Sequence, residues 1–503
     1  MRLTILIALL TGLLLAAPGF SQTDRDLTEV PLYELVERGD LGLDALATLA
    51  NLAEAAGLTD MDPDEFSGMT LGELAGRTGL PPRRLIQQLG LASYRPISDP
   101  ATAINEPSRY AWELFIALNS KPAGLPASAG CVQWETFMEQ EQIYADPTRP
   151  PQYGPAAQCQ WAVHQRSAAP QIENARGRVP AHHVLTGHPA PFGIGAIETV
   201  AVNRTGVEYI SANDLYYQEG VLRKAMSAEG IQFPRLTKVP KGTWQKITAP
   251  QKSRFHWREF DVLVERTDGT TYQAQESRGL IAFGIVTKDL PFWFWATFEH
   301  VDNPGRCGVT GCFDEFGVTQ PFTAPVRDPY HVYPAEPLSA PLRSLFAAAN
   351  IDPVFQNYRL KGVQIAFTDS YGRPTILGNS QQEAGQVATS SCMTCHARAS
   401  VSQGVLPTVQ TSQDGLAAIQ DAYEHGVPNQ ILNPAKNDAN PVIGFVGTPE
   451  AGWYFTNPAG PATEPLQIMF QTDFLWQLPL APQRRKNWTP PTSQQPSVVE
   501  PIP

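Results

Sequence analysis

The sequence predicts an α+β fold, and three observations lead to that prediction. Apolar residues recur at helical spacing in the part of the chain before Leu91. Between Glu198 and His300 the period changes towards two, which is typical of strands. The 503 residues include 46 prolines, which favours long ordered loops over a compact helical bundle. We therefore expect a small N-terminal helical subdomain, a central β-rich domain with long loops, and a helical C-terminal region.

The N-terminus has the pattern of a secretory signal peptide over residues 1–21. Arg2 precedes an apolar run at 3–17, and Gly19 and Ser21 form the small-x-small pair that precedes a cleavage site. The run is too short for a stable transmembrane helix, so we expect cleavage and export to the periplasm. An uncleaved anchor is the alternative. No second apolar span follows, so we expect no membrane span once the signal is removed.

Residues 22–95 are predicted to form the helical subdomain. Leucines recur at helical spacing from Leu43 to Leu52. Thr70 followed by Glu73 is a capping box, which predicts that a helix begins there. Gly79 and the two prolines after Leu80 predict its end.

Residues 105–370 are predicted to form a mixed α/β body. The aromatic-rich segment 110–118 predicts a helix at its start. Residues 260–265 alternate in polarity, and the runs 280–286 and 292–298 have the composition of buried strands. The body is therefore expected to contain a β-sheet or sandwich with long loops.

Six cysteines are present, and in an exported protein an even number suggests pairing. Two of them belong to a motif described below. The simplest disulfides among the others are Cys131 with Cys159 and Cys307 with Cys312, and glycines between the last two permit a tight loop. A zinc site is the rival interpretation, but no His or second Cys pair lies at zinc-finger spacing.

Cys392, Cys395 and His396 form a Cys-x-x-Cys-His motif, the strongest signal in the sequence. Two thiols separated by two residues can add to the two vinyl groups on one edge of a haem, and the adjacent His then supplies a nitrogen to the iron. The chain's own Cys and His frequencies give about 0.001 accidental occurrences of this spacing, so chance is a poor explanation. We expect one covalently attached haem c, with His396 as the proximal iron ligand.

The surroundings of the motif favour haem attachment over a redox Cys-x-x-Cys. Asn379-Ser380 followed by Glu383 predicts a helix start, so we expect a helix that leads towards the motif. A thioredoxin-like site should instead follow a strand in a βαβ unit, which the sequence does not predict here. We assign residues 371–485 to a helical, cytochrome c-like haem region and 486–503 to a disordered Pro-rich tail.

Several segments resemble a family of exported single-haem cytochrome c proteins, which is largely uncharacterised in function. The similar segments are residues 111–119 (AWELFIALN), 294–303 (FWATFEHVDN), 358–360 (YRL), 378–380 (GNS) and 390–397 (SSCMTCHA). The family commonly has Trp-Pro after the first segment, where this chain has Ser120-Lys121-Pro122. The resemblance implies haem binding and electron transfer, and it implies no particular substrate.

A six-coordinate iron needs a second ligand, usually Met or His. His300 is one candidate, because on a strand it would end an aromatic face shared with Phe298, with Asp302 nearby to orient it. A hydrogen-bonded core histidine is the alternative. Met469 is a weaker candidate, because a Met flanked by Ile and Phe is typical of core packing. Trp295 could pack against the porphyrin or belong to the core.

These features predict an exported c-type cytochrome that transfers electrons. A haem-dependent oxidoreductase, peroxidase- or oxygenase-like, is an alternative, since several hundred residues surround one haem where a carrier domain needs about 100. A sensor or scaffold subunit of a periplasmic redox complex is a second alternative. The net charge of −12 argues against nucleic acid and suits a basic redox partner, and it is equally a solubility device.

Overall fold

The structure of the 503-residue chain is a computed structural model. It describes residues 43–58, 61–81, 100–122, 130–153, 196–265, 271–382, 390–402 and 469–484, apart from 309, 327, 329 and 350, and short pieces at 32, 85, 89, 159, 171–173, 447–449, 454–456 and 466–467. The predicted signal peptide at 1–21 and the predicted tail at 486–503 lie outside these residues.

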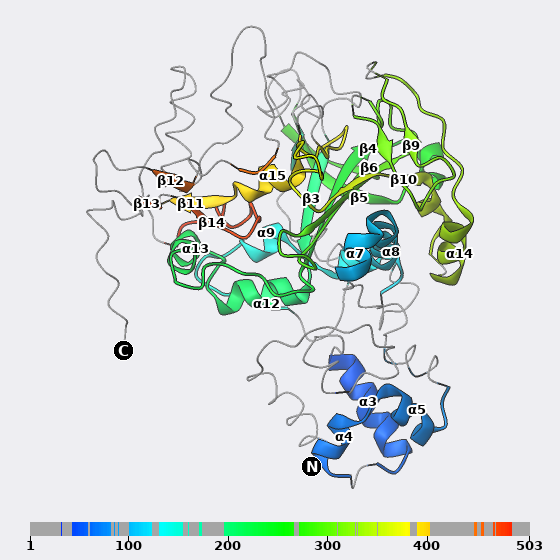
Figure 1. The fold of residues 1–503 in the computed structure, drawn as a ribbon, viewed down its shortest axis with the longest axis vertical. Helices are drawn as coiled ribbons and strands as arrows, with labels where there is room; N and C mark the ends of the chain where they lie inside the picture. Colours follow the sequence, from blue (N-terminus) through cyan, green and yellow to red (C-terminus); the bar gives the residue numbers. More distant parts are fainter. Residues whose placement is uncertain are drawn as a thin grey trace.

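A sheet of eight strands forms the centre of the part that the structure describes (Figure 1). Six strands follow the order β1 (Met138–Glu139), β3 (Ile197–Val202), β4 (Lys238–Lys246), β6 (Thr271–Thr287), β5 (Trp257–Glu265) and β2 (Gln171–Glu173). β7 (Phe294–His300) pairs with both β6 and β10 (Tyr358–Gln364). All pairs are antiparallel except β2 with β5, so the predicted α+β class is confirmed.

β6 organises the sheet because its 17 residues are long enough to pair with three strands. Along one edge it pairs first with β5 and then, from Ala282 onward, with β7. Along the other edge it pairs with β4. The strands predicted at 260–265, 280–286 and 292–298 are thus present, although Phe292 and Trp293 precede β7 and Trp293 has a left-handed backbone (φ 62°).

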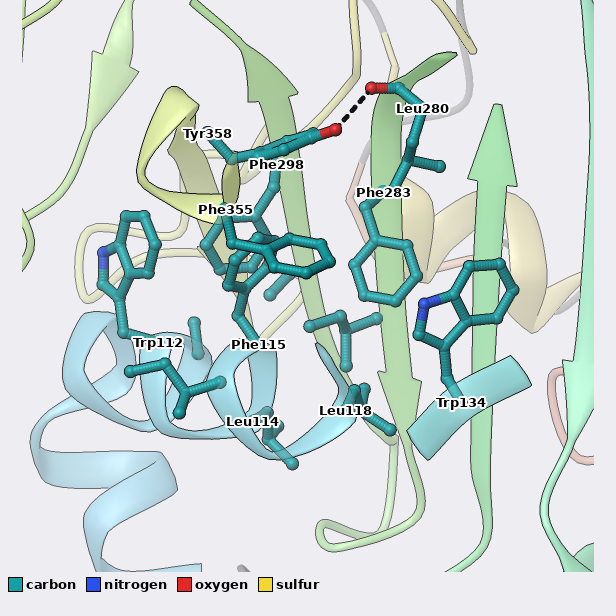
Figure 2. Close-up of a cluster of buried hydrophobic side chains, with 14 of the residues drawn as sticks. Trp112, Leu114, Phe115, Leu118, Trp134, Leu280, Phe283, Phe298, Phe355 and Tyr358 are labelled. Carbon is teal, nitrogen blue, oxygen red and sulfur yellow. Dashed lines mark hydrogen bonds between the residues drawn. The ribbon is translucent and has the colours of Figure 1, made fainter. Parts of the chain in front are cut away.

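One face of the sheet is covered by the helix predicted at 110–118, which is α8 (Pro107–Asn119). Phe115 lies with its ring 4.5 Å from that of Phe298 on β7, and Trp112 packs edge-on at 4.9 Å from the same ring. Figure 2 shows these side chains between the helix and the strands. This face is the larger hydrophobic core of the described residues.

The opposite face is covered by α12 (Arg204–Ala212), α13 (Gln218–Ala225), α15 (Cys392–Ala397) and the segment 469–481 (Figure 1). β11 (Ser400–Ser402) pairs with β14 (Met469–Gln471) in this layer. Trp295 of β7 packs here, whereas Phe294, Ala296 and Phe298 pack on the α8 face. The alternation of a strand therefore sends neighbouring residues of β7 into two separate cores.

The N-terminal helices α3 (Leu43–Ala55), α4 (Pro63–Gly68) and α5 (Leu71–Thr78) have a hydrophobic core of their own. The predicted capping box is confirmed: the Thr70 side chain accepts from the Glu73 backbone N–H, and the Glu73 carboxylate accepts from that of Thr70. Gly79 ends α5 in a left-handed conformation (φ 66°), which glycine adopts without steric cost. These helices lie at the bottom of Figure 1, away from the sheet.

The remaining described elements are short. They are the helices α7 (Pro100–Asn105), α9 (Gln140–Ile143) and α14 (Ala340–Ala349), the 3-10 helices η4 (Gln133–Thr136), η5 (Ala249–Ser253) and η6 (Pro353–Asn357), and the strands β8 (Cys312–Phe313), β9 (Phe322–Thr323), β12 (Phe455–Thr456) and β13 (Leu466–Gln467). Among the described residues, no helix has the length and apolar character needed to cross a membrane.

Both predicted disulfides are confirmed. Cys131 and Cys159 are bonded with their Cα atoms 6.0 Å apart, and Cys307 and Cys312 with theirs 4.9 Å apart. The glycine before Cys312 has φ 78°, so the tight loop does depend on glycine as expected. Disulfides of this kind are typical of proteins that fold in an oxidising compartment.

Candidate functional site

The Cys-x-x-Cys-His motif forms helix α15 itself. Ser391 is the N-cap, and its hydroxyl accepts a hydrogen bond of 3.2 Å from the Thr394 backbone N–H. Gln364, at the end of β10, accepts from the Met393 N–H at 2.9 Å and donates to the Ser391 hydroxyl at 2.7 Å. The start of the helix is therefore fixed to the sheet by a side chain of β10.

The segment before the motif differs from the expected approach helix in the residues that can be described. The Asn379 side-chain oxygen accepts from the Gln381 N–H at 2.8 Å, which makes a turn, and Leu377 pairs with Ser391 across a short parallel bridge. Residues 383–389 of the expected helix lie outside the described residues. The described part of 371–485 contains one six-residue helix and short strands, so a helical cytochrome-like region is not shown there.

The three motif side chains occupy neighbouring positions on one face of α15, because residues three and four apart on a helix lie side by side. Cys392 and Cys395 are partly exposed and stand outside the two disulfides. The Cys392 Sγ lies 3.4 Å from the Leu377 carbonyl oxygen. Two thiols and one imidazole are thus presented together, which is the geometry that thioether attachment of a haem requires.

The hydrogen bond of His396 fixes which ring nitrogen is available to a metal. Its Nδ1 lies 2.8 Å from the Phe474 carbonyl oxygen. A carbonyl oxygen only accepts, so Nδ1 carries the proton and Nε2 carries the lone pair. Burial lowers the pKa of His396 from its ordinary 6.5 to about 4, so the ring is neutral at neutral pH. A neutral imidazole with its other nitrogen anchored is the usual form of a metal-binding histidine.

Trp295 and three phenylalanines form an aromatic cluster on one side of the His396 ring. The Trp295 ring lies 4.6 Å from it, and the Phe474 ring lies 6.2 Å from that of Trp295. Phe367 and the half-exposed Phe292 pack beside Phe474 at 6.5 and 6.1 Å. An apolar, aromatic wall therefore lies next to two partly exposed thiols and an oriented imidazole.

His300 is placed elsewhere, contrary to the expectation that it faces the motif. β7 pairs with β6 in an unbroken register, and five positions separate Trp295 from His300. An odd separation on a regular strand puts two side chains on opposite faces of the sheet, and five residues span about 16 Å. His300 stacks on Phe255 at 3.8 Å, on the side of the sheet away from His396.

The bonds of His300 also differ from those of a ligand. Its Nε2–H donates to the Arg254 carbonyl at 3.0 Å, and its Nδ1 accepts from the Asp302 backbone N–H at 3.1 Å. Both ring nitrogens are therefore used inside the protein, and none is left for iron in this arrangement. The alternative that the sequence left open, a hydrogen-bonded core histidine, describes what is seen.

Met469 lies in the same layer as the motif. It is fully buried on β14 and pairs with Ser402 on β11, the strand that begins four residues after His396. Its neighbour Phe470 packs in the core that also contains Met393 and Ala397 of α15. The pairing of β14 with β11 therefore joins Met469 to the strand that follows the motif. Its role as second ligand stays a prediction.

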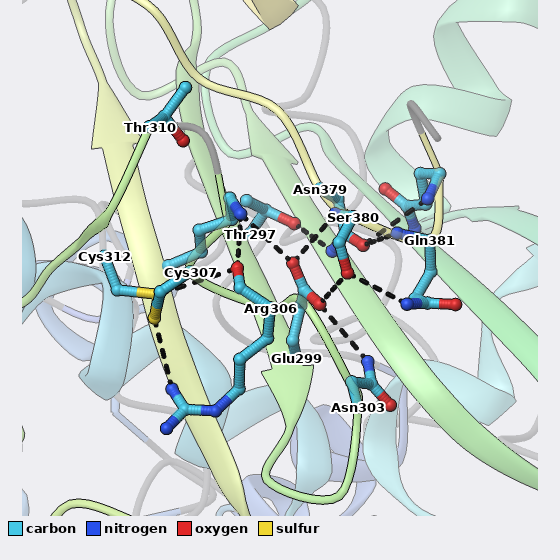
Figure 3. A network of polar contacts seen from close by, with 12 residues as sticks. Thr297, Glu299, Asn303, Arg306, Cys307, Thr310, Cys312, Asn379, Ser380 and Gln381 are labelled. Carbon is cyan, nitrogen blue, oxygen red and sulfur yellow. Dashed lines mark hydrogen bonds and ion pairs between the residues drawn. A yellow bond between two sulfur atoms is a disulfide. The ribbon is translucent and has the colours of Figure 1, made fainter. Parts of the chain in front are cut away.

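Glu299, next to His300, is the centre of a buried polar network on the motif side of the sheet (Figure 3). Its carboxylate accepts from the Ser380 backbone N–H at 2.8 Å and lies 3.5 Å from the Lys361 ammonium. Asn379 donates to the Thr297 hydroxyl at 2.7 Å. The segments 294–303 and 378–380, which both resemble segments of the cytochrome family, are therefore in direct contact.

Sequence reasoning missed the groups that orient the motif. The acceptor for His396 is a backbone carbonyl 78 residues away, which no side-chain pattern reveals. Gln364 belongs to no strand or motif that the sequence predicted, so nothing in the sequence pointed to it. Asp473, the residue before Phe474, is buried and bonded to Lys288, and its isolated charge in an apolar segment was the one hint available.

Among the described residues, no group of three or more His, Cys, Asp or Glu side chains is arranged to hold a metal ion. In comparisons with known proteins, no family model, no curated protein and no solved structure matches this chain.

Proposed function

We propose that this chain is an exported c-type cytochrome that carries one haem, joined to Cys392 and Cys395 and ligated by His396, and that it transfers electrons. The observation that carries the proposal is the pairing of the motif with the His396 hydrogen bond. Nδ1–H is fixed on the Phe474 carbonyl, so the Nε2 lone pair is available beside two accessible thiols.

Attachment would form one S–C bond at each cysteine, as each S–H adds across a vinyl C=C and its hydrogen moves to the neighbouring carbon. No oxidant or reductant is consumed in this addition. The bound haem would supply a one-electron iron couple. The chain's own part is to hold the ring of His396 neutral and oriented, with Trp295 packed against that ring and Phe474 packed against Trp295.

We prefer electron transfer to enzyme catalysis as the function of this motif. The size of the body around one motif makes a haem oxidoreductase the second candidate. The two differ in the sixth position of the iron. A carrier has a second protein ligand, for which Met469 is the remaining candidate, and gives low-spin spectra in both oxidation states. A high-spin iron that binds carbon monoxide or peroxide would favour the enzyme. A sensor or scaffold subunit would bind a ligand or a partner without turnover.

The attachment test replaces both motif cysteines. The Cys392→Ala, Cys395→Ala double variant, exported from a host with haem-attachment machinery, should lose the covalent haem band on a denaturing gel stained for haem peroxidase activity. The matched control is Cys307→Ala, Cys312→Ala, which removes the other close cysteine pair and should keep the band. Covalent haem at the wild-type level in the motif variant would overturn the proposal.

A further inference from the structure

Asp473 is a buried carboxylate next to the carbonyl that binds His396. It is 4% exposed and lies on the turn after β14. One carboxylate oxygen pairs with the Lys288 ammonium and accepts from the Trp293 indole N–H at 3.3 Å, and the other accepts from the Phe233 backbone N–H at 2.7 Å. Burying an ion pair this deeply is unfavourable unless further hydrogen bonds satisfy the carboxylate, and here they do.

The backbone of the turn is held in a conformation that side chains disfavour. Asp473 and Phe474 have φ values of 47° and 68°, and Trp293 has 62°. Left-handed backbone at three non-glycine residues persists only where surrounding contacts impose it. The contacts here are those between Asp473, Lys288 and Trp293, so the ion pair and the strained backbone belong to one arrangement.

The arrangement of Asp473, Lys288 and Trp293 is connected to the motif through two contacts of His396. The Phe474 carbonyl, one residue after Asp473, is the acceptor for His396 Nδ1–H. Lys288 and Trp293 come from the connection between β6 and β7, which also places Trp295 against the His396 ring. The connection is itself fixed, because the Lys288 ammonium donates to the Pro291 carbonyl at 3.0 Å and the Trp295 indole donates to that of Phe292 at 2.9 Å.

We infer that Asp473, with Lys288 and Trp293, is a positioning residue that aims the Phe474 carbonyl at His396 and thereby sets the reduction potential of the iron. The inference rests on the proposed haem attachment. A well-aimed acceptor on Nδ1–H makes the imidazole more basic, and a more basic ligand stabilises ferric iron over ferrous iron. Weakening the arrangement lets the carbonyl turn away, so the reduced form gains population.

Two variants test this without changing any residue that touches the haem-binding thiols. Asp473→Asn keeps the size of the side chain and removes its charge. Trp293→Phe keeps a buried aromatic ring and the Lys288–Asp473 pair, and it removes the indole donor with the smaller ring that carries it, so it changes no charge. At a fixed ambient potential, Asp473→Asn should raise the ratio of reduced to oxidised protein by about tenfold, which is about 59 mV for a one-electron couple. Trp293→Phe should shift it in the same direction by about threefold.

The matched control is Glu336→Gln, which removes one charge from another largely buried ion pair, that with Arg306. It should change stability and leave the potential in place. Spectroelectrochemical titration of each full-length holoprotein gives the potential, and the ¹H–¹⁵N signal of the His396 Nδ1–H gives the state of its hydrogen bond. That signal should move in the two test variants and stay in the control.

The inference is overturned if Trp293→Phe has the wild-type potential and Nδ1–H signal, or if Asp473→Asn shifts the potential no more than Glu336→Gln does. Should Asp473→Asn fail to accumulate, Trp293→Phe decides the question. Haem content separates the two levels of the argument. A wild-type protein without covalent haem refutes the proposed function, whereas a fully loaded protein with unshifted variants refutes only the role of Asp473.

Discussion

His300 is buried and His396 is partly buried; both imidazoles have a lowered pKa, and they differ in their hydrogen bonds. Burial lowers the pKa of each from 6.5 to about 4. Both ring nitrogens of His300 are hydrogen-bonded, to the Arg254 carbonyl and the Asp302 N–H, whereas His396 uses Nδ1 to donate to the Phe474 carbonyl. A sequence shows neither the direction of a ring nor its partners. Hydrogen-bond geometry, and not the charge of the ring, therefore distinguishes the candidate ligand from the core histidine.

The depressed pKa of His300 predicts an acid-sensitive fold. The unfolded chain takes up a proton near pH 6.5 and the folded one only near pH 4, so stability is complete above 6.5 and is lost as the pH falls towards 4. The share of His300 in that loss is about 3 kcal/mol. His300→Gln keeps a donor and an acceptor without titrating, so its unfolding free energy should fall less between pH 7 and pH 4.5.

Urea denaturation at the two pH values measures this difference. His331→Gln is the control, because His331 is only half-buried, and its pH dependence should follow the wild type. Parallel curves for His300→Gln and the wild type would show that the buried imidazole does not drive the acid loss.

Helix α8 and helix α15 show how differently two elements depend on their surroundings. α8 has 13 residues and a broad apolar face, so its sequence alone predicts it. α15 has six residues, which is too short for a helix that stands alone in water. Its cap at Ser391 and the hydrogen bonds from Gln364 supply the stabilisation that so short a helix lacks by itself.

Phe115 is expected to be the most sensitive position of α8. Its ring meets those of Phe283, Phe298, Phe355 and Tyr358 within 6.0 Å, so truncation leaves a large cavity among rigid rings. Phe115→Ala should lower the free energy of unfolding by about 3–5 kcal/mol. Ile104→Ala on α7 is the control: this side chain is 56% exposed, and its loss should change stability by no more than about 0.5 kcal/mol.

Chemical denaturation followed by tryptophan fluorescence compares the two variants, since Trp112 and Trp134 lie in the same core. An equal effect of the two substitutions would mean that α8 does not anchor the sheet as the packing indicates.

The whole chain carries a formal net charge of −12, which acts on any partner before contact. If the protein exchanges electrons with a basic partner, a cationic probe should react at a rate that falls as salt is added. Raising the ionic strength from about 0.01 to 0.15 M shortens the screening length from about 30 to 8 Å. We expect the rate constant for electron exchange with hexaammineruthenium to fall over this range and that with ferricyanide to rise.

Stopped-flow measurement with a neutral quinone provides the control, whose rate should hardly depend on salt. The same slope for the cationic and the anionic probe would show that the net charge does not steer encounter, and would remove the electrostatic reason for a basic partner.

Local pattern was sufficient for much of this molecule. The α+β class, the capping box at Thr70, helix α8, the central strands and both disulfides follow from periodicity, capping chemistry and cysteine spacing. These features depend on residues that are near one another in sequence, or on whether each side chain of a helix or strand faces the core or the solvent. The Cys-x-x-Cys-His motif belongs with them, because its chemistry is contained in five consecutive residues.

Tertiary structure decided everything that joins distant segments. The acceptor for His396 lies 78 residues further along the chain, and Lys288 lies 185 residues before Asp473. His300 was assigned to an aromatic face correctly, yet only the register of β7 against β6 shows that this face looks away from α15. Periodicity tells which side of a strand a residue takes, and it cannot tell what packs there, because that depends on how the layers close around the sheet.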